Sequence, residues 1–189
     1  MTFPRVSRHN AETESPPAED RLEAVFARWQ DELLGMLYYL LGNVEDARDA
    51  LQEAFVKCWR RREGLEEIEN LRAWIFRIAL NAGRDLRGTA WRRRRRPLQE
   101  REFKLVTHED SPQEEVIHRE RLALVGGALL KLRIEEQEVF LLRQNGQLTY
   151  EQIAESIGIP VGTVKTRMRL ALTKLREALQ TADGSDKTQ

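Results

Sequence analysis

Residues 149–179 contain a tight joint between two amphipathic helices, which limits the folds open to this chain more than any other segment does. Thr149 and Gln152 have the spacing of a capping box, which predicts the start of a helix. Gly158 ends that helix because glycine enters the left-handed conformation without steric cost, and Pro160 suits the first turn of a new helix. The inner stripe expected for the second helix is Val164, Met168, Ala171 or Leu172, Leu175 and Leu179. The pattern predicts a helix-turn-helix.

The outer face of the second helix is basic. Residues 161–176 contain five basic residues and no acidic one. Such a helix fits the major groove of DNA, and its first turns reach deepest when the preceding helix rests on the backbone. The candidates for reading an upstream DNA element are therefore Lys165, Thr166, Arg167 and Arg169. Lys174, farther along, is expected to contact phosphates. The alternative is a helical hairpin with a solvated basic face.

The net charge of zero conceals a segregation of charge along the chain. Residues 84–96 hold seven arginines against one aspartate, a balance of +6, and residues 97–120 hold three basic residues against seven acidic ones, a balance of −4. Different surfaces are therefore expected to meet different partners. The arginine run is predicted to bind DNA phosphates without sequence preference; its members are Arg92, Arg93, Arg94, Arg95 and Arg96.

Helical periodicity runs through the chain and no strand alternation occurs. The fold class expected is all-α: two small helical domains joined by a flexible linker, the C-terminal one a helix-turn-helix. Helices are expected over residues 21–41, 44–61, 71–87, 113–132 and 135–143, before the helix-turn-helix. The expected boundaries are a disordered tail (1–19), a first domain (20–96), an acidic linker (97–112), a second domain (113–180) and a disordered tail (181–189).

The helix expected over residues 71–87 has a polar face beside an apolar one. Its predicted inner stripe is Leu71, Trp74, Ile75, Ile78, Ala79, Ala82 and Leu86. Arg77, Asn81 and Arg84 follow each other at steps of four and three on another face, where they can contact phosphates or base edges. Asn70 is placed to cap this helix. The alternative is that this polar face binds nothing and is simply exposed to solvent.

Several classes of protein are disfavoured by what the sequence lacks. Its three histidines, His9, His108 and His118, have no second ligand at metal spacing, and no glycine-rich phosphate loop is present. We therefore expect no enzyme, no metal and no cofactor. The single cysteine, Cys58, fits a reducing compartment, and no apolar run suggests a signal peptide or membrane insertion. A cytoplasmic location is expected.

Three segments together resemble the extracytoplasmic-function sigma factors of bacterial RNA polymerase, which belong to the sigma-70 family. They are DARDALQEAFVKCWRR (residues 46–61), NLRAWIFRIALNAGRDLRG (70–88) and EEQEVFLLRQNGQLTYEQIAESIGIPVGTVKTRMR (135–169). The resemblance covers residues 21–179. The sequence departs from the family pattern at Leu170–Leu172 and at Arg133–Ile134. These departures bear on which promoter is read.

The resemblance implies a promoter-recognition factor for transcription initiation at a subset of genes. Its partners would be RNA polymerase core enzyme, promoter DNA with −10 and −35 elements, and an anti-sigma factor or other regulator. It implies that Asp49, Gln52 and Glu53 dock on the polymerase, and that the loop 63–70 holds a flipped −10 base. The −10 contacts implied are Asn70, Arg77, Asn81 and Arg84.

The alternative function is a stand-alone helix-turn-helix regulator, whose last domain would look similar. The first domain discriminates between the two, because a regulator needs a ligand pocket or a dimer seam there. This chain instead offers a basic face and an acidic face.

Overall fold

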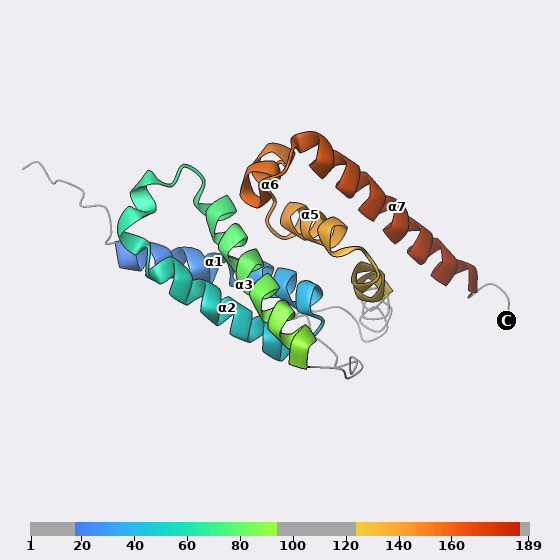
Figure 1. Cartoon of the computed structure of the whole chain (residues 1–189), viewed down its shortest axis with the longest axis horizontal. Helices are drawn as coiled ribbons and strands as arrows, with labels where there is room; N and C mark the ends of the chain where they lie inside the picture. The colour runs from blue at the N-terminus through green and yellow to red at the C-terminus, as the bar shows by residue number, and fades with distance from the viewer. Residues whose placement is uncertain (1–17, 94–123, 186–189) are drawn as a thin grey trace, which may run out of the picture.

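The structure, a computed structural model, describes residues 18–93 and 124–185. It is shown in Figure 1. The tails expected at residues 1–17 and 186–189, the acidic linker, the start of the second domain and Arg94–Arg96 lie outside the described residues. Within the described residues there are helices and no strand, as the all-α prediction requires.

The first group of helices consists of α1 (Ala18–Leu41), α2 (Val44–Trp59), the short 3₁₀ helix η1 (Arg62–Glu67) and α3 (Leu71–Arg93). Gly42 turns the chain between α1 and α2 with a positive φ of 78°. Asn43 then caps α2, since its side-chain oxygen accepts a hydrogen bond from the backbone N–H of Asp46 at 2.7 Å. The resulting antiparallel helices pack against α3.

The start of α3 is fixed by Asn70, as predicted. Its Oδ1 accepts from the backbone N–H of Ala73 at 2.9 Å, which satisfies one of the unpaired donors of the first turn. The interruption before it is not irregular, because residues 62–67 form η1. The end of α3 lies at Arg93 rather than at residue 87. The helix therefore continues into the arginine run.

The second group comprises a helical segment at residues 124–130, followed by α5 (Ile134–Gln144), α6 (Tyr150–Ile157) and α7 (Val161–Ser185). The predicted joint between α6 and α7 is confirmed. Thr149 and Gln152 form the capping box with hydrogen bonds of 2.8 and 3.2 Å, and Gly158 is left-handed with φ 69°. The last helix runs to Ser185, past residue 180.

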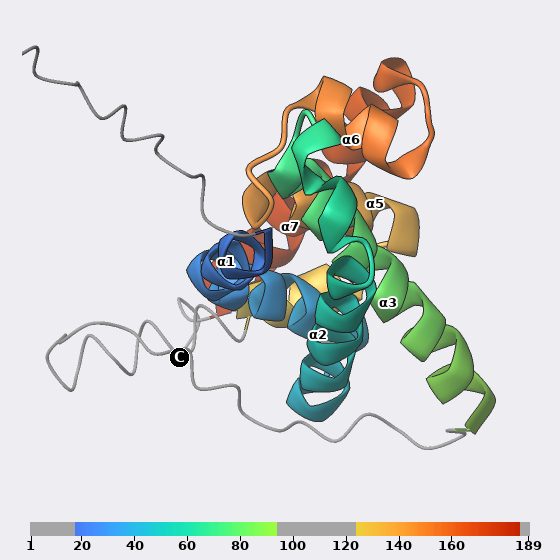
Figure 2. The same ribbon diagram turned by 90° about the vertical axis from the view of Figure 1, so that its left-hand side faces the viewer.

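The two groups share one hydrophobic core instead of standing apart. α5 lies against α1, and α6 lies against α3 (Figure 2). Phe76 and Leu80 of α3 are fully buried although they lie off the predicted inner stripe. The reason is that α3 has neighbours on two sides, α1 and α2 on one and the second group on the other. A helix in that position is apolar on more than one face.

The inner stripe predicted for α7 is partly wrong. Val164, Met168, Ala171 and Leu175 are buried, but Leu172 is 41% exposed and Leu179 is 37% exposed. Ala171, rather than Leu172, packs with Leu129 and Leu132 in a small second cluster. The far end of α7 extends beyond the other helices (Figure 1), so apolar residues there find little to pack against.

Candidate nucleic-acid interface

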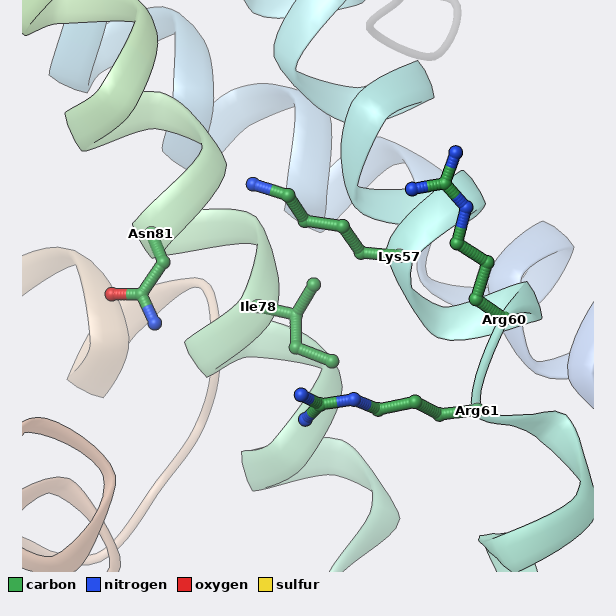
Figure 3. Close-up of a pocket in the computed structure, with 5 residues that line it drawn as sticks. All are labelled: Lys57, Arg60, Arg61, Ile78 and Asn81. Carbon is green, nitrogen blue, oxygen red and sulfur yellow. The ribbon is translucent and has the colours of Figure 1, made fainter.

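A basic hollow lies between the end of α2 and the middle of α3. It has a volume of about 360 Å³ and is lined by Lys57, Arg60, Arg61, Ile78 and Asn81. Figure 3 shows the three basic side chains on one wall and Asn81 on the other. Cationic groups beside an amide suit a nucleic-acid strand, because the cations contact phosphates and the amide contacts base edges.

Lys57 is held in place beside this hollow. Its Nζ lies 3.1 Å from Asp85 Oδ2 and 3.4 Å from Glu53 Oε1. Burial alone would lower the pKa of Lys57, but hydrogen bonds and charge from Asp85 and Glu53 outweigh it and raise the pKa. The ammonium group is therefore positioned and charged at neutral pH.

Sequence reasoning singled out Asn81 in this hollow but missed its basic wall. Lys57, Arg60 and Arg61 are spaced i, i+3 and i+4, so in the helix expected over residues 44–61 they lie together on one face near its end. That spacing was a signal available in the sequence.

The other residues predicted to contact a −10 element are placed differently. Arg77 is half-buried and Asn81 is exposed, whereas the Asn70 side chain is used as a helix cap. Arg84 donates from Nε to Glu138 Oε1 at 2.6 Å and from Nη2 to Glu138 Oε2 at 2.5 Å. The Glu138 side chain is 6% exposed and the Arg84 side chain is 40% exposed, so this two-pronged pair joins α3 to α5 with the carboxylate buried and the guanidinium partly exposed. The hydrogen bond to Glu138 raises the pKa of Arg84.

The outer face of α2 changes character along its length. Asp49, Gln52 and Glu53, the residues predicted to dock on a protein, are all exposed. Val56 follows with 40% exposure, and the basic wall of the hollow begins one residue later. An acidic surface therefore borders a basic one, with the apolar Val56 between them.

The outer face of α7 presents the predicted DNA-reading residues. Lys165, Thr166 and Arg169 are exposed and Arg167 is half-buried. Thr166 Oγ1 donates to the Gly162 carbonyl at 3.0 Å, within its own helix. The first turns of α7 are therefore open on the basic side.

Lys174 corrects the sequence interpretation. It was expected on the outer, phosphate-binding face, but its Nζ lies 2.7 and 2.6 Å from the two carboxylate oxygens of Glu136. The Glu136 side chain is only 4% exposed. Lys174 therefore joins α7 to α5 inside the second group, and the basic outer face is shorter than predicted.

Within residues 18–93 and 124–185, no three histidine, cysteine or acidic side chains gather as a metal site. In the same residues no helix combines the length and apolar character needed to cross a membrane.

Comparison with known proteins identifies both groups of helices. Residues 25–96 match the family model for Sigma-70 region 2, and residues 122–175 match that for Sigma-70 region 4. The RNA polymerase sigma-E factor of Streptomyces antibioticus is 31% identical over 162 residues, which cover 85% of this chain and 86% of that protein. The chain is an extracytoplasmic-function sigma factor of the sigma-70 family. Its partners are therefore RNA polymerase and promoter DNA.

Other relatives agree with this assignment. The ECF RNA polymerase sigma factor SigW of Bacillus subtilis is 26% identical over 86% of this chain and 90% of its own length. Among solved structures, the sigma factor RpoE from Bartonella quintana, in complex with the anti-sigma factor NepR, shares the fold with a TM-score of 0.71 at 21% identity. That match covers 85% of this chain and 98% of that one. CnrH, in complex with the cytosolic domain of CnrY, matches with a TM-score of 0.61 at 26% identity over 86% of this sigma factor and 90% of CnrH.

These matches span both groups of helices, and a stand-alone helix-turn-helix regulator is therefore not favoured. The sequence prediction of a promoter-recognition factor is confirmed. Region 2 corresponds to α1–α3, and region 4 contains α5, α6 and the first part of α7.

Proposed function

We propose that this sigma factor divides promoter recognition among three surfaces: the acidic part of the α2 face, the basic hollow between α2 and α3, and the start of α7. The observation that carries the proposal is the change of charge along α2, where an exposed acidic and apolar surface borders a cationic hollow. A protein partner fits the first part, and a nucleic-acid strand fits the second.

The acidic surface is proposed to dock on the polymerase. Asp49, Gln52 and Glu53 are exposed and adjacent along one helix face, and electrostatic complementarity would guide them to a basic partner surface. The double substitution Asp49→Lys with Glu53→Lys is expected to abolish co-purification with core enzyme while the far-ultraviolet circular dichroism stays unchanged. The matched control is Arg48→Glu, an exposed residue of the same helix. Unchanged core affinity in the double variant would contradict the assignment.

The hollow is proposed to receive the −10 strand. Arg60 and Arg61 supply phosphate contacts, and Asn81 is placed to form hydrogen bonds with a base edge. η1 and Asn70, which precede α3, are proposed to border the path of the strand. Arg77 is proposed as a further contact on α3. Transcription by core enzyme from a library with randomised −10 positions is expected to lose preference at one or two positions with Asn81→Ala. Arg61→Ala is expected to lower activity without changing preference.

The start of α7 is proposed to read the −35 element through Lys165, Thr166, Arg167 and Arg169. The exposure of its first turns supports this role. Arg169→Ala is expected to relax preference at one or two −35 positions, because a base-edge hydrogen bond discriminates by about 1–3 kcal/mol. If Arg169→Ala changed activity but left the selected −35 sequences identical, the residue would be a backbone contact.

The proposed activity is binding without catalysis, in the cytoplasm, where polymerase and promoter DNA meet. The RpoE and CnrH structures were solved as complexes, RpoE with the anti-sigma factor NepR and CnrH with the cytosolic domain of CnrY. We propose by analogy that a regulator of the anti-sigma kind also binds this chain. Affinity capture on the full-length chain from its own cells, followed by mass spectrometry, tests for both core polymerase and such a regulator.

A further inference from the structure

The first half of α7 carries two exposed leucines among polar and charged residues. Leu170 is 38% exposed and Leu172 is 41% exposed. Both lie in the segment where the sequence departs from the family pattern, and the proposed function gives neither of them a role. A single exposed apolar side chain is common on protein surfaces. What each leucine can do is therefore decided by its position on the helix.

Leu170 lies on the side of α7 that faces away from the core. Val164 and Met168, which are 0% and 3% exposed, turn the other side of the helix toward the core. Thr166 is exposed and lies four residues before Leu170, so the two are one turn apart on the same outer face. Leu172, two residues farther on, points about 160° away from Leu170 around the helix axis.

Thr166 adds a methyl group to this outer face. Its hydroxyl donates to the Gly162 carbonyl at 3.0 Å, so the hydroxyl proton is used within the helix and is not available to a base. Apart from an oxygen acceptor, the group that Thr166 offers to an incoming surface is its methyl. We call this methyl and the side chain of Leu170, one turn later, the apolar strip.

The charges around the apolar strip suit DNA. Lys165 and Arg169, both exposed, flank the strip on one side. The first acidic residue of α7 is Glu177, nearly two turns beyond Leu170, where a carboxylate would repel phosphates. The eight residues from Gly162 to Leu170 span about 12 Å at about 1.5 Å per residue, which is about the width of a major groove. The apolar strip therefore lies within the length of helix that one groove can hold.

Only one of the four bases offers an apolar group in the major groove. Thymine presents its C5-methyl beside an oxygen acceptor, whereas the edges of the other bases are donors and acceptors. A leucine packed against a polar edge would remove water without replacing its hydrogen bonds, which is unfavourable. The same leucine against a methyl group buries apolar surface on both sides. Leucine at this place thus favours thymine and disfavours its competitors.

We propose that the apolar strip selects thymine in the −35 element by its C5-methyl group, with Leu170 as the main contact and the methyl of Thr166 as the second. This inference rests on the proposed function of α7 and adds the base that this part of the helix selects. Lys165 and Arg169 contact neighbouring base edges and phosphates. The −35 element consequently contains a thymine, on one strand or the other, at the position that faces Leu170.

The first test removes the methyl group from the DNA and leaves the protein unchanged. The preferred −35 sequence is selected from a randomised library with the full-length chain and core enzyme, and each thymine is then replaced in turn by deoxyuridine, which lacks only the C5-methyl. Wild-type holoenzyme is expected to bind about fourfold more weakly at one position, the loss for one methyl group removed from an apolar contact. Leu170→Ala is expected to bind thymine and deoxyuridine equally at that position.

Matched variants separate the apolar strip from a general effect on α7. Leu172→Ala removes a leucine of similar exposure from another side of the helix and should keep the preference for thymine over deoxyuridine. Thr166→Ser removes the methyl and keeps the hydroxyl, so it should weaken a thymine preference that Thr166→Val retains. An unchanged preference in Thr166→Ser would remove Thr166 from the strip.

The second test changes the selected base. Leu170→Arg places a guanidinium where the leucine was, and arginine forms paired hydrogen bonds with the O6 and N7 acceptors of guanine. Selection from the randomised −35 library is therefore expected to change from thymine to guanine at the position that Leu170 faces. Far-ultraviolet circular dichroism verifies that the variant keeps its helices. Selection of the same base by wild type and Leu170→Arg would contradict the proposed contact.

The thymine contact and the proposed function of α7 fail in distinguishable ways. A selected −35 element without thymine on either strand, or equal binding of wild type to thymine and deoxyuridine at every position, overturns the thymine contact. If Arg169→Ala still relaxes −35 preference in that case, α7 remains the reading helix. If neither Arg169→Ala nor Leu170→Ala changes −35 preference, the assignment of α7 is wrong as well. Lower transcription by Leu170→Ala with unchanged preference would identify Leu170 as a polymerase contact and overturn the proposal.

Discussion

Arg72 donates its Nε to the backbone carbonyl of Gly146 at 2.6 Å, which fixes the first turn of α3 to the loop ahead of the helix-turn-helix. The same guanidinium lies 4.9 Å from the centre of the Trp29 ring and 5.2 Å from that of Phe76. Burial lowers the pKa of Arg72, partly offset by Glu32 at 3.8 Å, but an arginine remains charged at any relevant pH. The Arg72 side chain thus joins α3 both to α1 and to the loop after α5.

Arg72→Lys is predicted to destabilise the protein by about 2 kcal/mol, although it keeps the charge. A lysine cannot form two parallel hydrogen bonds or stack on the rings in the same way. Urea unfolding followed by circular dichroism measures the loss. Arg87→Lys, on the exposed part of α3, is the control and should leave stability unchanged. Equal stability of the two variants would show that the contacts of Arg72 contribute nothing.

Lys174→Ala is predicted to reduce stability by about 2 kcal/mol, because it leaves the buried carboxylate of Glu136 without its partner. The estimate is below the range for fully buried pairs, since the Lys174 side chain is 39% exposed. Removing both charges by adding Glu136→Gln should restore part of the stability. A thermal-unfolding double-mutant cycle measures the coupling. Arg169→Ala should instead alter DNA selection and leave the melting temperature in place.

Two glycines of α3 are predicted to respond in opposite ways to alanine. At Gly83 a Cβ would lie 2.7 Å from Leu40 Cδ2 and 3.0 Å from Leu37 Cδ2, so Gly83→Ala should cost about 1 kcal/mol after the gain in helix propensity. At Gly88 nothing lies within 4 Å, so Gly88→Ala should stabilise by about 0.5–1 kcal/mol. Thermal melts of the two variants test the sign. Equal changes in melting temperature in the two variants would mean that the α1 side chains near Gly83 move aside at no cost in stability.

We predict that the protein loses stability at alkaline pH because the Cys58 thiol is buried. Burial raises the pKa of its thiol from 9.0 to about 12, so the folded state resists ionisation that the unfolded chain permits. This stabilising effect is complete below pH 9 and is lost as pH rises toward 12, at about 1.4 kcal/mol per pH unit. Tyr38 and Tyr39, whose pKa values burial also raises, act in the same direction above pH 10. Cys58→Ala should flatten the pH dependence of unfolding between pH 9 and 10, where the tyrosines contribute little.

We predict that the arginine run makes DNA affinity depend on salt concentration without making it depend on DNA sequence. Replacing Arg92–Arg96 with glutamine should flatten the plot of log affinity against log salt by about 0.9 for each phosphate that the variant no longer binds. Holoenzyme binding to promoter DNA across a salt series measures the slope. Replacing Arg48 and Arg87, which lie elsewhere on region 2, provides the comparison. An unchanged slope in the run variant would identify those arginines as solvated surface.

The helices and the helix-turn-helix joint were predictable from the sequence because they depend on local signals. Asn70, Thr149 and Gly158 act on backbone groups within a few residues, so their roles can be recognised from neighbouring sequence alone. The contacts between the two groups of helices were not predictable in this way. Arg84 and Glu138 are 54 positions apart, and an arginine on a polar helix face has the same local pattern whether water or a distant carboxylate faces it. The same ambiguity placed Lys174 on the wrong surface.

Three consecutive polar residues at the start of α5 point to three different neighbours. Glu136 binds Lys174 within region 4, Gln137 binds the Tyr39 carbonyl of α1, and Glu138 binds Arg84 of α3. Region 4 therefore cannot be exchanged as an independent module without consequence. A hybrid that takes region 4 from a relative with other residues at the positions of Gln137 and Glu138 is expected to read a new −35 element, but it would also be without the hydrogen bonds that join region 4 to region 2. We expect such hybrids to be less stable than either parent, and restoring these two residues should recover the lost stability.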